Sequence, residues 1–349
     1  MSLIGVIEGF FGPAWPESNR KSYARFLKEV GGDFYIYAPK KDPFLRKKWR
    51  EEWSSDYVHF LQELISNFHA EGIKFGVGFS PFGLGTSLTA DDKAMLMQKA
   101  SQLEALGVDI LGLFFDDMPV TEKLAETQLQ TLDVVRKIFK GKIVFCPSFY
   151  TPDPVLDKVF GQRPPGYLDD LANKIPDEVA IAWTGPKVIS PVIDKEHLRE
   201  TQKLLRRKPY IWENLFANDG PRNCKFLKLK PFSGREKGTL EEAEAFGLNL
   251  MNQPELSKIL FLASLFVLRE AADPEEAFQK ALASLCSDPF SQFLQQHREL
   301  FLTTGLDGIS EEQKSDLLLE LSACEEVSSH EVRDWLNGKY IVDSECLTD

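Results

Sequence analysis

Short apolar runs recur along the first three quarters of the chain, and amphipathic stretches separate them. The runs cover residues 3–7, 33–37, 73–79, 108–115, 142–146, 179–183, 209–212 and 246–251. Most are too short to be helices, and they are rich in Val, Ile, Phe and Tyr. This composition is typical of strands that are buried on both faces, as in a parallel sheet. The pattern therefore predicts eight buried strands.

The stretches between these runs have the periodicity of helices. The clearest covers residues 56–71, where Asp56 can cap the first turn and Gly72 can end the last. Its apolar positions form one stripe: Tyr57, Phe60, Leu61, Leu64, Ile65 and Phe68. Similar helices are predicted over residues 91–107, 122–139 and 194–207, the last followed by the stop signal Pro209.

Eight strands that alternate with helices over about 250 residues favour an α/β fold of the closed (β/α)8 TIM-barrel type. A doubly wound open sheet is the alternative. That fold usually carries a glycine-rich phosphate loop after an early strand. Gly76 and Gly78 are the nearest candidates, but they lie inside a predicted strand. We therefore expect residues 1–270 to form a catalytic barrel.

The remaining residues, 271–349, contain no strand signal. An apolar helix over residues 256–269 is expected to close the barrel, and further helices are predicted over 275–301 and 311–327. We interpret residues 271–349 as a small helical extension that packs on the barrel.

Composition excludes several classes of function. The formal net charge of −12 disfavours a nucleic-acid partner, because such a surface repels phosphate. No apolar stretch is long enough for a membrane span, and the first residues resemble a strand more than a signal peptide. The five cysteines lack a C-x-x-C pair, so reduced thiols are expected. With no signal peptide or membrane span predicted, we expect a cytoplasmic location, and secretion as a trimmed mature chain is the alternative. The oligomeric state cannot be inferred.

The chemistry of a parallel barrel lies at the carboxyl ends of its strands. Here these ends carry carboxylates, amides and aromatic rings, a mixture that suits a sugar: rings pack on the apolar face of a pyranose, and Asp and Asn bind hydroxyls and amides. The five histidines fall in predicted helices or in the tail. A histidine-based metal centre, a Ser-His-Asp triad and a cofactor are therefore not expected.

Asp116 and Asp117 form the most informative pair, because they directly follow the strand at 108–115. Neighbouring carboxylates that are partly desolvated raise the pKa of one of them, which can then donate a proton to a glycosidic oxygen. The two carboxyls of an ordinary retaining glycosidase flank the bond about 5–5.5 Å apart. Consecutive residues fit substrate assistance better, with the acetamido oxygen of the sugar as the nucleophile. A solvated turn with a helix cap and a carboxylate-bound metal are the alternatives.

Several short motifs together resemble glycoside hydrolase family 84, the group of O-GlcNAcases and bacterial β-N-acetylglucosaminidases with a hyaluronidase-like NAGidase domain. The motifs appear in the order and spacing of that family and span about residues 4–260. They are GVIEGFFG (5–12), YAPK (37–40), FDD (115–117), CP (146–147), WTGPK (183–187), WEN (212–214) and AND (217–219).

The resemblance implies a role for each matching residue. Asp116 would orient and polarise the acetamido group, and Asp117 would be the general acid and base. Tyr150 would support the acetamido oxygen and the anomeric centre. The other implied contacts are sugar-binding: Asn214 at the acetamido group, Trp212 at the acetyl pocket, Asp219 at O4 and O6, Gly5 and Lys40 on the O3 side, and Asn249 as a further amide.

The sequence departs from the family pattern at a few positions. Phe11, Glu213 and Phe216 stand where tyrosine, aspartate and histidine are common, and Leu250 replaces a proline beside Asn249. Glu8 lies in a strand that should be buried, where an unpaired charge is costly, so we expect it to pair with a basic group.

The predicted function is retaining hydrolysis of terminal β-linked GlcNAc through an oxazoline intermediate. The substrate would be Ser/Thr of a glycoprotein or another glycan, and the sequence leaves both open. The alternatives are a non-catalytic module that binds GlcNAc-modified proteins, and an unrelated barrel lyase or metal hydrolase. An intact carboxylate pair argues against the binding module, because a binder gains little from it.

Overall fold

The computed structural model of the chain describes residues 2–342, 346 and 348. Within this part, eight parallel strands close into a barrel in the order of the sequence. The first strand closes it by pairing on both sides, with Gly5 opposite Phe34 of the second strand and Gly247 of the last. The strands are β1 (Leu3–Glu8), β2 (Phe34–Tyr37), β3 (Lys74–Phe79), β4 (Ile110–Phe114), β5 (Lys142–Cys146), β6 (Ala180–Trp183), β7 (Tyr210–Glu213) and β8 (Ala245–Leu248).

The predicted barrel is confirmed, and the open sheet is excluded by the closed strand order. Each of the eight apolar runs forms a strand, whose first and last residues differ by a few positions from those predicted. The last differs most, since β8 ends at Leu248 and leaves Asn249 beyond the strand. Gly76 and Gly78 lie within β3, as expected.

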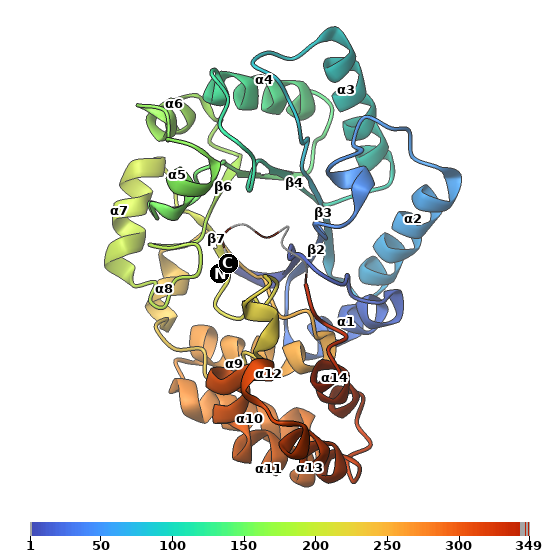
Figure 1. The fold of residues 1–349 in the computed structure, drawn as a ribbon. Coiled ribbons are helices and arrows are strands. Elements are labelled where there is room, and N and C mark those ends of the chain that lie inside the picture. The colour runs from blue at the N-terminus through green and yellow to red at the C-terminus, as the bar shows by residue number, and fades with distance from the viewer. Residues whose placement is uncertain (1, 343–345, 347, 349) are drawn as a thin grey trace.

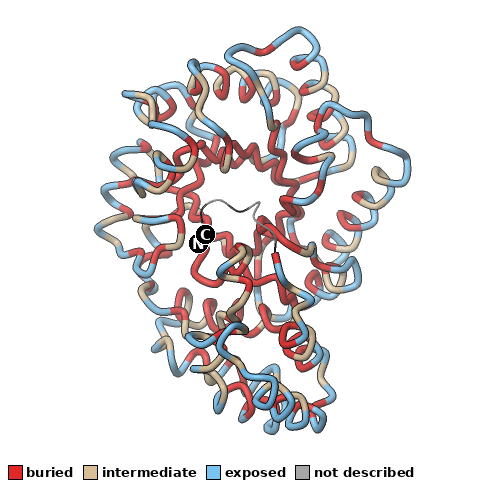
Figure 2. The backbone as a smooth tube through the Cα atoms, in the orientation of Figure 1, coloured by how far each residue is buried: buried red, intermediate tan, exposed pale blue. Residues whose placement is uncertain are grey.

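Helices surround the barrel, and Figure 1 shows them as an outer ring. Figure 2 shows that the strands inside this ring are buried and that most exposed residues lie on the helices and loops around them. The helices of the ring are α1 (Glu17–Val30), α2 (Ser55–Ala70), α3 (Ala90–Ala105), α4 (Leu124–Arg136), α5 (Val155–Phe160), α6 (Tyr167–Lys174), α7 (Lys195–Leu205), α8 (Lys237–Glu241) and α9 (Pro254–Glu270), and 3-10 turns lie at η1 (Pro43–Leu45) and η2 (Asn223–Lys225).

The local signals explain most helix ends. The hydroxyl of Ser54 accepts from the backbone of Tyr57 at the start of α2, so Ser54 is the cap where we had predicted Asp56. Gly72 has a φ of +76° just after this helix, a conformation that favours glycine. Asp194 caps α7 by accepting from the backbone of His197 at 2.8 Å.

A helical extension follows the barrel, at the bottom of Figure 1. The predicted helix over 275–301 divides because Ser287 caps a new helix. The predicted helix over 311–327 ends at Leu321, and the sequence reading missed the helix that follows it. The extension consists of α10 (Pro274–Leu285), α11 (Asp288–Gln296), the π-helical η3 (Leu300–Thr304), α12 (Gly305–Gly308), α13 (Glu311–Leu321) and α14 (Val327–Leu336).

The last helix of the extension is tied to the barrel. The carboxylate of Glu331 on α14 accepts from the backbone N–H groups of Glu255 and Leu256, both at 2.9 Å, and so caps the amino end of α9. The indole of Trp335 donates to the carbonyl of Cys224 at 3.1 Å. One buried core runs through the barrel and the extension, so a division at residue 270 stays a prediction.

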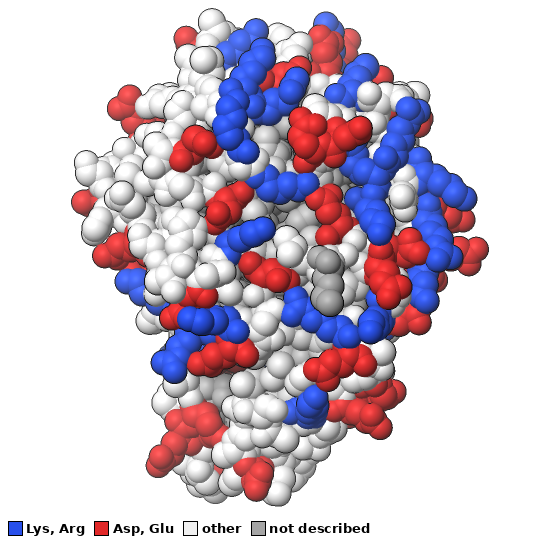
Figure 3. Space-filling model, turned by 180° about the vertical axis from the view of Figure 1, so that it is seen from behind, with Lys and Arg blue, Asp and Glu red and all other residues white. Residues whose placement is uncertain are grey.

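Charged side chains are interspersed on the face turned away from the viewer of Figure 1, which Figure 3 shows. Lys and Arg alternate there with Asp and Glu. Such mixing keeps a surface soluble without a strong field of one sign. Among the described residues, no helix is both long and apolar enough to cross a membrane.

A buried ion pair fixes the carboxyl end of β1. The predicted partner of Glu8 is Arg20 on α1, whose guanidinium donates twice to the carboxylate at 2.7 Å. The hydroxyl of Tyr35 and the backbone of Trp15 donate to the same carboxylate. Every charge here has a partner, so removing one partner exposes the other to the full cost of burial.

We expect Arg20→Met to lower the free energy of unfolding by about 3–5 kcal/mol, because it leaves the Glu8 carboxylate buried without its cation. Urea denaturation would measure the loss. The matched control is Arg25→Met on the same helix, where the arginine pairs with Glu29 in solvent and its loss should change little. Similar unfolding curves for the two variants would contradict this account of β1.

Candidate active site

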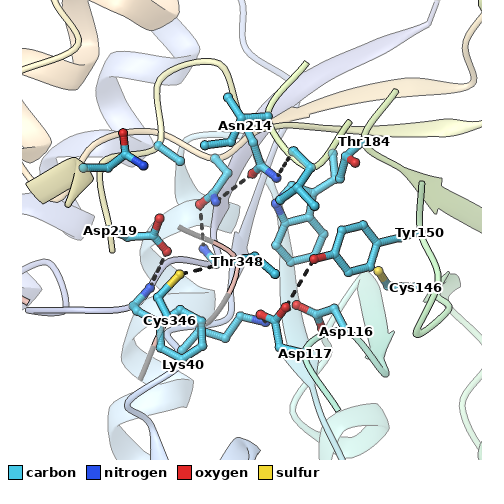
Figure 4. Close-up of a pocket in the computed structure, with 18 residues that line it drawn as sticks. Lys40, Asp116, Asp117, Cys146, Tyr150, Thr184, Asn214, Asp219, Cys346 and Thr348 are labelled. Carbon is cyan, nitrogen blue, oxygen red and sulfur yellow. Dashed lines mark hydrogen bonds and ion pairs between the residues drawn. The ribbon is translucent and has the colours of Figure 1, made fainter. Parts of the chain in front are cut away.

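A pocket opens at the carboxyl ends of the barrel strands. Figure 4 shows its polar side chains turned toward one another from different strands. The lining residues are Gly9, Phe11, Lys40, Asp116, Asp117, Cys146, Tyr150, Thr184, Val188, Ile189, Trp212, Asn214, Ala217, Asp219, Asn223, Asn249, Cys346 and Thr348.

Asp116 is held by a cation from the neighbouring part of the barrel. Lys40, which follows β2, donates from Nζ to Oδ2 of Asp116, and both side chains are buried. The other oxygen, Oδ1, is buried and has no hydrogen-bond partner within the described part of the chain. A buried carboxylate oxygen without a donor is costly. The pocket therefore presents an acceptor that a ligand N–H or O–H group can satisfy.

Asp117 turns toward the same pocket through an unusual backbone. Its φ is +56°, a left-handed conformation that aspartate adopts more readily than most residues. The hydroxyl of Tyr150 donates to Oδ1 at 3.2 Å, and Nζ of Lys40 lies 3.7 Å from Oδ2. Figure 4 shows Asp116 and Asp117 side by side, with the Tyr150 ring facing them.

The environment of Asp117 favours its protonated form. Burial raises the pKa of this carboxyl above its ordinary value, and the neighbouring charge of Asp116 raises it further. Lys40, Arg46 and the hydroxyl of Tyr150 act in the opposite direction, but the net shift of the pKa is upward. The pair thus combines a carboxyl whose pKa is raised with a second carboxyl that contacts the lysine ammonium, a combination suited to acid catalysis.

Two amides continue the polar wall. Nδ2 of Asn249 donates to Oδ1 of Asn214 at 2.9 Å, and Nδ2 of Asn214 donates to the carbonyl of Val188 at 2.9 Å. The backbone of Gly9 donates to Oδ1 of Asn249 at 3.3 Å. This chain of bonds links β1, β8, β7 and the loop after β6, so it fixes which way each amide points.

Asp219 occupies the opposite side of the pocket, where one of its oxygens accepts from the backbone of Phe11 at 2.8 Å. Burial raises the pKa of Asp219 to about 6. This carboxyl therefore changes its charge close to neutral pH, unlike an exposed aspartate.

Trp212 forms an apolar wall at the end of β7. Its ring packs edge-on against Phe114, with centroids 4.9 Å apart. A Cβ atom at Gly9 would lie 2.4 Å from the indole, so glycine is required for this close approach. The ammonium of Lys40 lies 5.7 Å from the centre of the Trp212 ring.

The comparisons with known proteins agree with this geometry. A model of the family described as NAGidase, beta-N-acetylglucosaminidase, matches residues 4–300. The chain belongs to the β-N-acetylglucosaminidase family. This confirms the predicted family.

Individual relatives point the same way. The chain is 32% identical over 245 residues to the protein O-GlcNAcases of Rattus norvegicus and Mus musculus, which covers 67% of this chain and 26% of each relative. It therefore spans about a quarter of the length of these relatives. A solved O-GlcNAc hydrolase variant of Thermobaculum terrenum is 26% identical, with a TM-score of 0.77 over 96% of this chain and 80% of that one.

The pocket rests on buried polar supports. Ser148 after β5 donates from its hydroxyl to the carbonyl of Phe115 at 2.8 Å, directly before the aspartate pair. Gln128 on α4 donates to the hydroxyl of Ser148, and the backbone N–H of Ser148 donates to the hydroxyl of Tyr167 on α6. These bonds connect the loop after β4 to two outer helices, so the aspartates are held by the body of the barrel.

A second support lies beside Asn214. Glu213 and Arg235 form a fully buried pair at 2.7 Å. The same guanidinium donates to the carbonyls of Ser190 and Pro191, in the loop that carries Val188. Glu213 also accepts from the backbone of Leu215. The pair therefore fixes Asn214 and the loop that it contacts relative to each other.

The structure brings together eight of the nine residues that the sequence nominated: Lys40, Asp116, Asp117, Tyr150, Trp212, Asn214, Asp219 and Asn249. The exception is Gly5. It lies in the middle of β1, where neighbouring strands flank it, and it does not reach the pocket. Gly9, four residues later and beyond the strand, lines the pocket instead. The prediction for Gly5 was wrong because this residue lies within β1 and not at its carboxyl end, where the pocket opens.

Other lining residues were missed. Gly9, Phe11, Cys146 and Thr184 lie in the quoted motifs or strand ends, so their positions contained a usable signal. Val188 and Ile189 follow the WTGPK motif in the same loop. Asn223, Cys346 and Thr348 carried no comparable signal.

The end of the chain returns to the mouth of the barrel. Val342 is buried against Phe11 and Cys224, and its backbone N–H donates to Sγ of Cys224 at 3.5 Å. Cys346 and Thr348 then line the pocket itself, as Figure 4 shows. Part of the space beside Asp219 and Asp117 is thus occupied by the chain.

The pKa of Asp219 generates a prediction for sugar binding. As pH falls through about 6 the carboxylate takes up a proton and becomes a weaker acceptor for hydroxyls. We expect KM for an aryl GlcNAc glycoside to rise below that pH while kcat changes less. Asp219→Asn should raise KM and remove this dependence. The same KM above and below pH 6 in the unmodified protein would contradict the prediction.

Proposed function

We propose that this protein is a retaining β-N-acetylglucosaminidase that removes terminal β-linked GlcNAc with the substrate's acetamido group as the nucleophile. One observation carries the proposal: the buried Oδ1 of Asp116, which has no partner among the described residues, lies beside a carboxyl whose pKa is raised. An acetamido N–H is a donor of the kind that this oxygen requires. The family membership and the relatives' names support the same activity.

In the first step Asp116 accepts the acetamido N–H and so increases the electron density on the carbonyl oxygen. That oxygen attacks C1 and forms a C1–O bond, while the bond from C1 to the leaving oxygen breaks. Asp117 gives its proton to the leaving oxygen. The product on the enzyme is a protonated oxazoline, whose N–H remains hydrogen-bonded to the Asp116 carboxylate, and no protein group has become bound to the sugar.

In the second step Asp117, now ionised, removes a proton from a water molecule. The water oxygen attacks C1, and the C1–O bond of the oxazoline breaks, which restores the acetamido group. Two inversions at C1 give net retention. Asp117 is again protonated, so the cycle is balanced. Tyr150, which already donates to Asp117, is placed to support the acetamido oxygen and the anomeric centre.

The remaining lining residues would bind the sugar. Trp212 offers an apolar face to the acetyl group, and Asn214 and Asn249 offer fixed amides. Asp219 would accept from O4 and O6, and Lys40 would contact the O3 side while it neutralises Asp116. Each step of the proposed reaction is assigned to protein side chains and to the sugar.

The substrate we propose is GlcNAc on Ser or Thr of a protein, with GlcNAc-terminated glycans as the second candidate. The names of the rat and mouse relatives favour the protein substrate. We place the activity in the cytoplasm, as expected from the reduced cysteines. Release of GlcNAc from a GlcNAc-Ser peptide and from a GlcNAc-terminated glycan, measured side by side, distinguishes the two substrates. No release from either, and none from a chromogenic glycoside, would leave the non-catalytic binding module as the better reading.

The assignment of Asp117 predicts a dependence on the leaving group. Asp117→Asn should lower kcat by about 10²–10⁴-fold on a glycoside with a poor leaving group, because the proton donor is lost. A glycoside of an acidic phenol needs no proton and should recover most of the rate of the first step. Asp116→Asn is the matched variant, and it should slow both substrates. Equal losses on both glycosides for Asp117→Asn would refute its role as the acid.

Because Cys346 and Thr348 line the pocket, we expect the end of the chain to compete with the sugar for this space. Cys346 and Thr348 must leave the pocket before a sugar can fill it. Ending the chain after Val342 should lower KM by roughly three- to tenfold with little change in kcat, since a larger fraction of the protein is then competent to bind. A synthetic peptide of residues 343–349, added to the shortened protein, should raise KM again. An unchanged KM after the truncation would show that these residues do not compete.

A further inference from the structure

Arg46 contacts the backbone of Asp117, although it is not one of the residues that line the pocket. It follows η1 in the segment after β2 and is buried. Its Nη2 donates to the backbone carbonyl of Asp117 at 3.0 Å. The guanidinium carbon lies 5.2 Å from the centre of the Phe82 ring and 6.0 Å from that of Phe11, so two aromatic faces hold it in place.

The bond from Arg46 reaches the one residue of the pocket with a strained backbone. Asp117 is one of three residues other than glycine with a positive φ in the described part of the chain, and the other two, Arg206 and Ala271, end helices. A strained conformation persists only where its surroundings determine it. A charge-assisted hydrogen bond to the carbonyl of Asp117 restricts rotation of the peptide that follows this residue. The direction of the Asp117 side chain depends on that rotation.

Arg46 also contributes to the charge around the carboxyl. Burial and Asp116 raise the pKa of Asp117, whereas Lys40 and Arg46 lower it. Lys40 is committed to Asp116 by a direct contact and lies farther from Asp117, at 3.7 Å. The other titratable groups that face Asp117 are Tyr150, Cys146, Asp219 and Cys346. None of these four carries a positive charge, so Lys40 and Arg46 are the cations among these neighbours that lower the pKa of Asp117, beside the hydrogen bond from Tyr150.

We infer that Arg46 is a positioning residue for the acid and base, which fixes the left-handed backbone of Asp117 through its carbonyl without touching the sugar. The inference rests on the proposed role of Asp117. The segment after β2 then contains two residues with different roles. Lys40 serves Asp116 and the substrate, and Arg46 serves Asp117 through the backbone. Nη1 of Arg46 is buried and has no hydrogen-bond partner within the described part of the chain, which lowers the stability of the fold.

The test uses the full chain with Arg46→Met and Arg46→Lys, and with Arg50→Met as the control. Arg50 lies on the same segment and binds Asp92 and the carbonyl of Phe82, away from the pocket. Each variant is assayed across pH on two aryl GlcNAc glycosides, one with an acidic phenol and one with a weakly acidic phenol as the leaving group. Melting curves report folding in parallel.

Arg46→Met should lower kcat by about 10–100-fold on the weakly acidic phenol and by less than about threefold on the acidic one, with KM within about twofold. The sign of the pH effect follows from the lost cation. Without it the pKa of Asp117 rises, so the proton is retained to higher pH. The alkaline fall of kcat/KM should therefore move upward by about half a unit to one unit. Arg46→Lys should return this limb toward its original position, and Arg50→Met should behave like the unmodified protein.

Equal losses on both glycosides with an unmoved alkaline limb would overturn the inference, because a merely structural role gives that result. If Arg46→Met does not fold, Arg46→Lys and Arg46→Gln decide, since the first keeps the charge and the second keeps a donor. An inactive unmodified protein would contradict the proposed function instead. An active protein whose Arg46 variants all match Arg50→Met would contradict this inference alone.

Discussion

The site depends on one ammonium group placed between two neighbouring carboxylates. Lys40 contacts Asp116 directly and lies 3.7 Å from Asp117. Two unit charges about 4 Å apart interact by about 4 kcal/mol at an effective dielectric near 20. One lysine attracts both carboxylates, so its attraction offsets their mutual repulsion and part of the cost of burying them. Without this cation, two adjacent aspartates at the mouth of a barrel would both tend to be neutral.

The barrel supplies what this arrangement needs. Lys40 follows β2 and the aspartates follow β4, so the pair forms only because parallel strands bring their carboxyl ends to one rim. Ser148 fixes the loop before the aspartates from β5, and the Glu213–Arg235 pair fixes the amide wall from β7. Burial that stabilises the fold also raises the pKa values of Asp117 and Asp219. Burial at this rim of the barrel thus contributes both to the stability of the fold and to the pKa values that the chemistry needs.

The sequence predicted the parts that depend on local pattern. Apolar runs gave all eight strands, and the rule that chemistry lies at strand ends located Asp116, Asp117 and Tyr150. Gly5 was placed wrongly because a short motif does not reveal where in the strand each residue lies. Helix α14 was missed because its apolar residues are few and its docking depends on Glu331, whose partners on α9 lie some 75 positions away.

Contacts between distant segments were outside the reach of local pattern. The approach of Cys346 and Thr348 to the pocket depends on how α14 docks and directs the chain back to the barrel. The hydrogen bond from Arg46 to Asp117 joins loops of two different strands, and no residue spacing reveals it. Such contacts follow from the closure of the barrel. They become visible only when the strand ends are placed in space.

The central claim is that the acetamido oxygen of the sugar performs the attack while Asp116 and Asp117 serve it. Comparing kcat/KM for an N-acetyl and an N-trifluoroacetyl glucosaminide with the same aryl leaving group tests this most directly, because fluorine makes the carbonyl oxygen a poorer nucleophile. The account predicts a much lower kcat/KM for the N-trifluoroacetyl substrate than for the N-acetyl substrate. Equal values for the two substrates would contradict it and would require a nucleophile from the protein or from water.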